Sequence, residues 1–138
     1  MGCLQNKQIL VGVSGGIAAY KTPELVRRLR DRGAEVRVIM PSAAESFITS
    51  LSLQAVSGHP VDVAEMSADS ESGMGHIDLA RWADLILIAP TTANTMARLA
   101  NGFGDELLTT VCLATSAPIA LAPAMNQQMW SNAATQAN

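Results

Sequence analysis

The feature that most constrains the fold is an apolar strand pattern that runs into two glycines and then into a helical pattern. Residues 8–14 (QILVGVS) form a continuous apolar run, typical of a strand buried on both faces. Residues 18–32 then have helical spacing, with Pro23 in the first turns and Gly33 just past the end. Residues 35–40 (EVRVIM) form a second strand pattern. Strand, glycine turn, helix and strand predict a βαβ unit with a right-handed crossover.

The rest of the chain continues to alternate between helical and strand patterns. We expect helices over residues 42–57 (with a break near Ser50), 76–83, 95–100 and 105–114, and a further helix to begin within residues 124–138. We expect strands over residues 84–89 and 119–122, ended by Pro90 and Pro123, and a mobile loop over residues 58–75. The pattern predicts one α/β domain over residues 1–138: a Rossmann-like three-layer sandwich with a mostly parallel sheet, flavodoxin-like.

Charge and cysteine content narrow the function classes. Nine Lys and Arg against twelve Asp and Glu give a net charge of -3, which argues against a nucleic-acid-binding protein. The two cysteines, Cys3 and Cys112, are too few for a disulfide framework or a four-thiolate metal site. No apolar run approaches the length of a membrane span, and no signal-peptide pattern is present. We therefore expect a soluble cytoplasmic protein.

Four loops follow the predicted strands and carry the residues suited to ligand binding. They cover residues 14–18, 41–44, 90–95 and 123–126, and ligands in such folds bind beyond the carboxyl ends of the strands. Glycines at a strand–helix turn let backbone N–H groups approach an anion. The turn is not G-x-G-x-x-G, and Met40 and Pro41 stand where a dinucleotide site has an acidic residue. A mononucleotide such as FMN therefore fits better than NAD.

Two polar side chains are candidates for chemistry. His76 opens a predicted helix after Gly75, so it is either a surface histidine or an imidazole placed for proton or carboxylate handling. Asn126 lies between Met125 and Met129 in a strand-end loop, and its amide could bind a ligand carboxylate or amide. Three other residues have simpler interpretations, with Trp82 packed in the core, Cys112 a small buried hydrophobe and His59 a solvated turn residue.

Four segments resemble the homo-oligomeric flavin-containing Cys decarboxylases, and together they extend over nearly the whole chain. They are GVSGGIAAYK (residues 12–21), HIDLARWADL (76–85), APTTANT (89–95) and PAMNQQMW (123–130). The resemblance is strongest to members that convert 4′-phosphopantothenoylcysteine to 4′-phosphopantetheine in coenzyme A biosynthesis. It implies a carboxy-lyase with FMN bound between neighbouring subunits of a homotrimer or a multiple of it.

The resemblance also implies a role for particular residues. The flavin phosphate side corresponds to Ser14, Gly15, Gly16 and Ile17. Pro41 stands where relatives commonly carry Thr, so a hydroxyl contact either shifts to Ser42 or is lost. The loop that holds flavin and substrate corresponds to Thr92, Ala93, Asn94 and Thr95, and Ala124 and Met125 lie against the cofactor. Asn126 binds the substrate, His76 matches the active-site histidine, and no metal is implied.

The family's substrate lid and its proton-donating cysteine follow the last motif, and neither Cys3 nor Cys112 occupies that position. We therefore expect a decarboxylase domain that lacks its lid and the ligase domain of bifunctional relatives, and that completes only thiol oxidation and carbon dioxide loss. Alternatives are a non-catalytic FMN-binding or regulatory module of the same fold, a related flavin prenyltransferase and a nicotinamide dehydrogenase. The prenyltransferases lack the M-N-x-x-M-W block.

Overall fold

The fold is built on one parallel sheet. A computed structural model describes residues 2–63 and 75–138, so most of the predicted loop over residues 58–75 lies outside the described residues. Five strands pair in the order β3-β2-β1-β4-β5, and all four pairings are parallel. The strands are β1 (Gln8–Gly12), β2 (Glu35–Met40), β3 (Asp62–Val63), β4 (Leu85–Thr91) and β5 (Ile119–Pro123). The predicted α/β class with a parallel sheet is confirmed.

The strand order places β1 between β2 and β4. Five strands in this order match the first five of the Rossmann arrangement, and without the two-residue β3 the remaining order is that of flavodoxin. In both arrangements the chain leaves β1 toward one side of the sheet and later crosses to the other. The carboxyl ends of β1 and β4 therefore form the switch point at which such sheets bind ligands.

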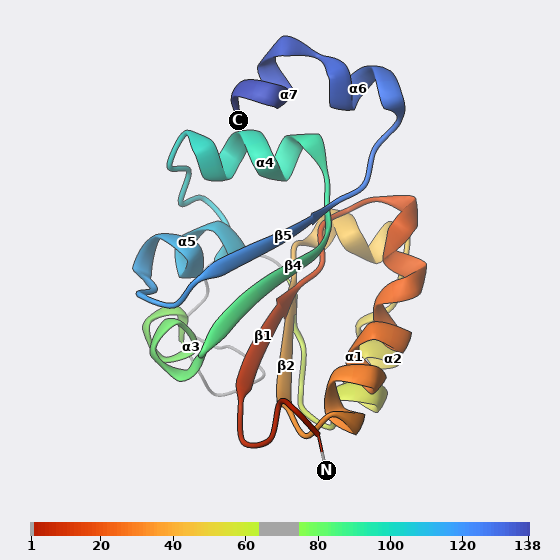
Figure 1. The fold of residues 1–138 in the computed structure, drawn as a ribbon, viewed down its shortest axis with the longest axis vertical. Helices are drawn as coiled ribbons and strands as arrows, with labels where there is room; N and C mark the ends of the chain where they lie inside the picture. Colours follow the sequence, from red (N-terminus) through yellow and green to blue (C-terminus); the bar gives the residue numbers. More distant parts are fainter. Residues whose placement is uncertain (1, 64–74) are drawn as a thin grey trace.

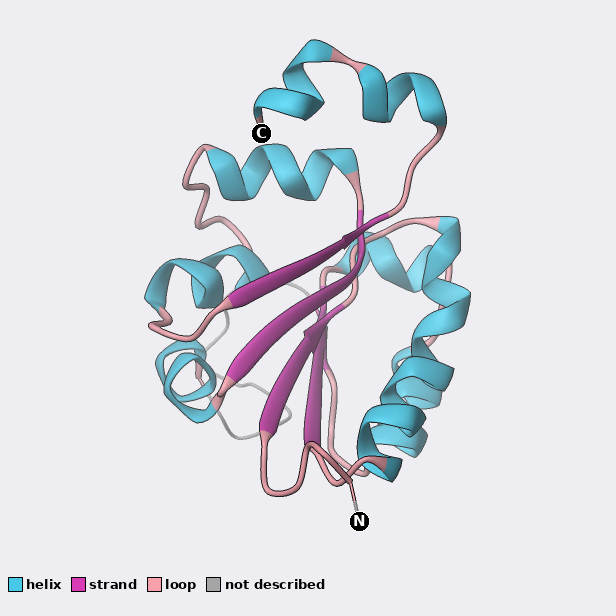
Figure 2. Cartoon of the chain, in the orientation of Figure 1, coloured by secondary structure: helices cyan, strands magenta, loops and turns pink. Residues whose placement is uncertain are grey.

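Helices cover both faces of the sheet and its carboxyl edge (Figures 1 and 2). On one face lie α1 (Thr22–Asp31) and α2 (Ser50–Ser57), and on the other lie α3 (His76–Trp82) and α5 (Leu107–Ala114). Beyond the carboxyl ends of the strands lie α4 (Ala93–Ala100), α6 (Gln127–Ser131) and α7 (Ala133–Ala137). Two short 3₁₀ helices, η1 (Ile17–Lys21) and η2 (Ser42–Ser46), follow β1 and β2. No helix in the described ranges has the length and apolar content that crossing a bilayer requires.

The core has two parts because successive strand residues point to opposite faces of the sheet. One part packs Val11, Val38 and other strand residues against Val26 of α1 and Leu53 of α2. The other part packs alternate strand residues against the second helical layer and includes Leu10, Ile39, Ile86, Ile88, Leu79, Leu108 and Val111. Trp82 packs against this second part, as predicted. By contrast, Ile119 and Leu121 of the edge strand β5 are each 40% exposed.

Several element boundaries differ from the sequence expectations. The helix expected over residues 18–32 is divided into η1 and α1. By contrast, the break expected near Ser50 is confirmed, because residues 42–57 are divided into η2 and α2, and α2 begins at Ser50. The hydroxyl of Thr49 caps α2 by accepting a hydrogen bond from Ser52 N at 3.2 Å. The short strand β3 was not predicted. Pro90 lies within β4 rather than ending it, where the β4–β5 register shifts between Ile88 and Thr91 and tolerates a residue without an N–H.

Two smaller expectations also change. Pro123 is the last residue of β5 rather than the residue after it, and an edge strand accepts proline more readily than a central strand does. His59 is not simply solvated, because its Nε2 lies 2.7 Å from Oε1 of Glu35.

Candidate functional site

The ends of β1 and β4 are joined by Ser14. Its buried hydroxyl donates to the carbonyl oxygen of Pro90 and accepts from the backbone N–H of Thr92 at 3.0 Å. The backbone N–H of Ser14 also donates to the Pro90 carbonyl, at 3.3 Å. The hydroxyl proton of Ser14 is therefore used inside the protein, and its predicted role beside the flavin phosphate stays a prediction.

The two glycines after Ser14 lie against neighbouring backbone and side chains. A Cβ on Gly15 would lie 3.2 Å from the backbone carbon and oxygen of Ala43, which follows Ser42 in η2. A Cβ on Gly16 would lie 3.2 Å from Cγ2 of Thr92. The turn formed by Gly15 and Gly16 therefore has no side chains, and it packs between the loops that follow β2 and β4. It leads directly into η1, and the first N–H groups of a helix lack partners within the helix.

The loop after β4 is shaped by two threonines. Oγ1 of Thr92 accepts a hydrogen bond from Thr95 N at 3.2 Å, so Thr92 caps α4, and it also donates to Oγ1 of Thr95 at 3.1 Å. Thr95 is buried, whereas the side chain of Asn94 is exposed. The threonines therefore fix the turn, and the Asn94 amide is the group of this loop that is open to a ligand.

The loop after β5 comes to the same edge. The backbone N–H of Ala124 donates to the carbonyl oxygen of Thr91 at 3.0 Å. Asn126 follows, and its Oδ1 accepts from Met129 N at 2.8 Å as the N-cap of α6. The amide was predicted to bind substrate rather than support the fold. It also caps a helix, which leaves the exposed Nδ2 as its donor for a ligand.

His76 belongs to a helix, α3, that lies apart from these loops in a single copy of the chain. It is the first residue of α3, with a half-buried side chain. Figure 1 shows α3 nearly end-on beside α5, at the level of the amino ends of β1 and β4. The strand-end loops lie at the opposite edge of the sheet. The structure therefore brings together all the predicted binding segments except the one that carries the histidine.

Thr22 also contributes to the site and was not among the predicted residues. It is the first residue of α1, 3% exposed, and its hydroxyl donates to the carbonyl oxygen of Ala89 at 2.9 Å. A threonine at a helix start is usually a cap, so the sequence carried no signal for this long-range contact. Thr22 also lines a cavity of about 220 Å³ between the start of α1 and the ends of β4 and β5, together with Ala18, Lys21, Leu25, Ala89, Pro90, Ala122, Pro123 and Ala124.

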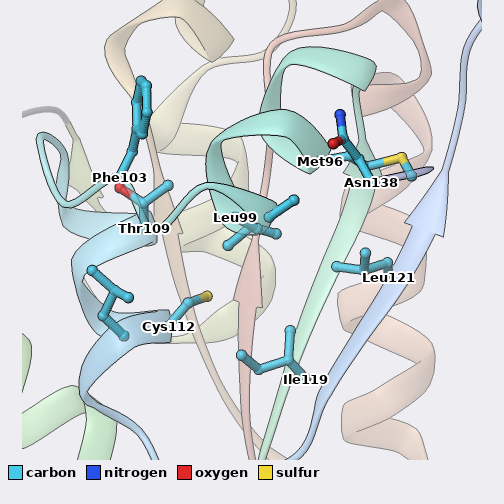
Figure 3. Close-up of a pocket in the computed structure, with 10 residues that line it drawn as sticks. Met96, Leu99, Phe103, Thr109, Cys112, Ile119, Leu121 and Asn138 are labelled. Carbon is cyan, nitrogen blue, oxygen red and sulfur yellow. The ribbon is translucent and has the colours of Figure 1, made fainter. Parts of the chain in front are cut away.

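A larger cavity, of about 320 Å³, lies between α4, α5 and β5 (Figure 3). Its walls are mainly apolar, with Met96, Leu99, Phe103, Ile119 and Leu121 among them, and none of the predicted site residues lines it. The thiol of Cys112 lies there, and burial raises its pKa to about 11. A thiol kept protonated in apolar surroundings is a poor nucleophile, in agreement with the prediction of a small buried hydrophobe.

The chain matches the flavoprotein family model over residues 1–138. It is 62% identical over 135 residues to the coenzyme A biosynthesis bifunctional protein CoaBC of Escherichia coli K12, covering 98% of this chain and 33% of that protein. It is 46% identical over 135 residues to CoaBC of Bacillus subtilis, covering 98% of this chain and 34% of that protein. The chain thus spans about a third of the length of these relatives.

Solved structures give the same answer at lower identity. The FMN-dependent cysteine decarboxylase SpaF superimposes with a TM-score of 0.88 at 34% identity, covering 98% of this chain and 78% of that one. A PPC decarboxylase variant complexed with pantothenoylaminoethenethiol superimposes with a TM-score of 0.81 at 33% identity, covering 96% of this chain and 75% of that one. Together, the family match along the whole sequence and the two superpositions show that the chain belongs to the flavoprotein family.

Proposed function

We propose that the chain binds FMN at the carboxyl edge of its sheet and acts in the FMN-dependent decarboxylation of 4′-phosphopantothenoylcysteine to 4′-phosphopantetheine. The observation that carries the proposal is the bare glycine turn held between the loops after β2 and β4. Two relatives support the choice of cofactor, because SpaF is an FMN-dependent cysteine decarboxylase and AtHal3 an FMN-binding protein. CoaBC supports the assignment to coenzyme A biosynthesis.

The residues at this edge fit FMN. Gly15 and Gly16 let the turn lie close against the loops after β2 and β4, because a Cβ would lie 3.2 Å from Ala43 or Thr92, and they leave its backbone without side chains toward a phosphate. The start of η1 favours an anion, and the exposed side chain of Ile17 beside it offers apolar surface to a ring. β2 ends in Met40 without a carboxylate that could hold a second ribose, which agrees with a mononucleotide.

The chain's own groups have distinct tasks in this proposal. The backbone N–H groups of Gly15 and Ile17 hold the phosphate, since that of Gly16 already donates to the Ser14 carbonyl at 3.0 Å. Ser42 and the Asn94 amide add side-chain contacts. Ala93, Ala124 and Met125 pack against the flavin. FMN, when bound, supplies the hydride-accepting chemistry. Nδ2 of Asn126 donates to the substrate carboxylate while its Oδ1 remains on Met129 N, and His76 accepts the substrate proton.

The position of α3 bears on the assembly. Helix α3, which begins at His76, lies away from the strand-end loops of its own copy, so we infer that a neighbouring copy supplies this histidine to the site. Such a site is complete only in an oligomer, and a homotrimer or a multiple of it is our proposal. The cytoplasmic location stays a prediction.

The first test is a visible absorption spectrum of the purified chain with native mass spectrometry. We expect a yellow protein with flavin absorbance, a mass corresponding to a trimer or a multiple of it, and tighter binding of FMN than of riboflavin. Anaerobic mixing with 4′-phosphopantothenoylcysteine should bleach the flavin and release carbon dioxide. A colourless protein that binds NAD would refute the proposal. Flavin binding without bleaching would support a non-catalytic FMN-binding module.

A further inference from the structure

Two hydroxyl groups donate hydrogen bonds to successive backbone carbonyls near the end of β4. Oγ1 of Thr22 donates to the carbonyl oxygen of Ala89 at 2.9 Å, and the hydroxyl of Ser14 donates to the carbonyl oxygen of Pro90. The donors come from the start of α1 and the end of β1, 67 and 76 residues away in sequence from their acceptors. Both donor residues are buried, Thr22 at 3% and Ser14 at 0% exposure.

These bonds lie where the regular ladder of the sheet is interrupted. The register between β4 and β5 shifts between Ile88 and Thr91, and the two acceptor residues lie inside that shift. Proline has no N–H for a ladder bond, so side-chain donors must help to define the path of the chain there. Immediately afterwards the chain enters the loop that carries Thr92, Asn94 and Thr95.

We propose that Thr22 is a positioning residue for the flavin site: its hydroxyl sets the direction in which β4 delivers this loop to the ligand. The inference rests on the proposed FMN binding. Without the hydroxyl, the buried Ala89 carbonyl loses a donor and the end of β4 relaxes toward other partners. Of the two hydroxyl bonds to the end of β4, only the one from Ser14 to the Pro90 carbonyl then remains, and the loop binds the flavin more weakly.

The test compares FMN binding in four proteins: the wild type, Thr22→Val, Thr22→Ser and the control Thr109→Val. Valine keeps the shape of threonine but removes the hydroxyl, and serine keeps the hydroxyl. Thr109 is a matched control because it is 1% exposed and its hydroxyl donates to the Glu106 carbonyl at 3.3 Å in α5, away from the site. The measurements are the FMN dissociation constant from flavin fluorescence, the visible circular dichroism of bound flavin, and the melting temperature without FMN.

We expect Thr22→Val to weaken FMN binding about tenfold and to change the flavin dichroism, and Thr22→Ser to stay within about twofold of the wild type. Thr109→Val should lower the melting temperature and leave FMN affinity unchanged. If Thr22→Val behaves like the control, the hydroxyl is merely structural and the inference is wrong.

Should Thr22→Val fail to fold, Thr22→Ala and Thr22→Ser replace it, because both lack the methyl group and only serine keeps the hydroxyl. Equal FMN affinities of that pair would overturn the inference. A wild type that binds no FMN would instead overturn the proposed function, and the inference with it. The two failures are therefore told apart by the wild type alone.

Discussion

At the scale of single residues, the site depends on Gly15 because this residue has no side chain. A methyl group there would lie 3.2 Å from the backbone of Ala43, closer than ordinary van der Waals contact. We expect Gly15→Ala to push the glycine turn away from Ala43, to displace its backbone N–H groups and to weaken FMN binding about tenfold, equivalent to about 1.4 kcal/mol. Isothermal titration with FMN measures this change.

The control for that substitution is Gly75→Ala. A Cβ at Gly75 meets no atom of the described residues (2–63 and 75–138) within 4 Å, and the φ of -73° at Gly75 suits alanine. This variant should bind FMN like the wild type. Equal affinity in both variants would show that the phosphate lies elsewhere.

Asn126 allows a substitution that separates its two contacts. Aspartate keeps an oxygen that can accept from Met129 N, so α6 stays capped, but it replaces the Nδ2 donor with a charged oxygen. We expect Asn126→Asp to melt within about 2 °C of the wild type and to bind FMN normally. Substrate-dependent flavin bleaching should slow at least about tenfold, because two carboxylates repel each other.

Asn126→Ala is the companion variant. It removes both the cap and the donor, so it should lose stability as well as bleaching, and the stability loss should be about 1 kcal/mol by urea denaturation. Unchanged bleaching in Asn126→Asp would remove this residue from the substrate site.

Residue identities were more predictable than residue contacts. The motifs pointed to the glycine turn, the threonines and Asn126, and the structure brings these segments to one edge. The use of the Ser14 hydroxyl inside the protein could not be foreseen, because its partners lie 76 and 78 residues away in sequence. A pattern within one segment carries no information about which distant carbonyl a hydroxyl will meet.

At the scale of elements, α5 gives a prediction about thiol reactivity. Burial raises the pKa of Cys112 from 9.0 to about 11, so at pH 8 only about one such thiol in a thousand is a thiolate. Cys3 is exposed. Iodoacetamide at pH 8 should therefore modify Cys3 first, as peptide mapping by mass spectrometry would show.

The same pKa shift predicts how the stability of the protein changes with pH. The folded protein holds the Cys112 proton more tightly than the unfolded chain, so this thiol's contribution is fully present below pH 9 and declines as the pH rises toward 11. In Cys112→Ala, the free energy of unfolding measured by urea denaturation should therefore fall less between pH 9 and pH 11 than in the wild type. Rapid alkylation of Cys112 in the folded protein at pH 8 would contradict its burial.

Elements with strong patterns were predicted well, and weakly specified ones were not. The apolar run of β1 and the valine-rich alternation of β2 (EVRVIM) both predicted strands, and the structure confirms them. β3 has only two residues and forms by pairing with β2, so no local sequence pattern predicts it. Pro90 suggested a strand end because proline cannot join a ladder, but the register shift beside it lets the strand continue to Thr91.

At the scale of the whole molecule, the separation of α3 from the strand-end loops can be tested by mixing two inactive variants. His76→Asn alone should suppress bleaching because an amide cannot accept a proton at neutral pH. If the histidine acts in a neighbouring copy, oligomers co-assembled from His76→Asn and Asn126→Asp copies should regain bleaching. With equal amounts and random assembly, about a quarter of the sites would carry both native residues.

The control mixes each variant with itself through the same assembly protocol and should show no recovery. An absence of recovery in the mixed oligomers, with mixing verified by native mass spectrometry, would place both residues in one copy or remove His76 from the chemistry.

The neighbouring positions of β1 and β4 have a consequence for synthesis on the ribosome. The two ends of the Ser14–Pro90 contact are separated by 76 residues, which at usual translation speeds corresponds to roughly 4 to 15 s. During that interval β1 can pair only with β2, and its other edge stays open to water or to chaperones. Parallel pairings between distant segments also form slowly after release. The nascent chain therefore has no cofactor pocket until β4 emerges, and flavin can be loaded only after that point.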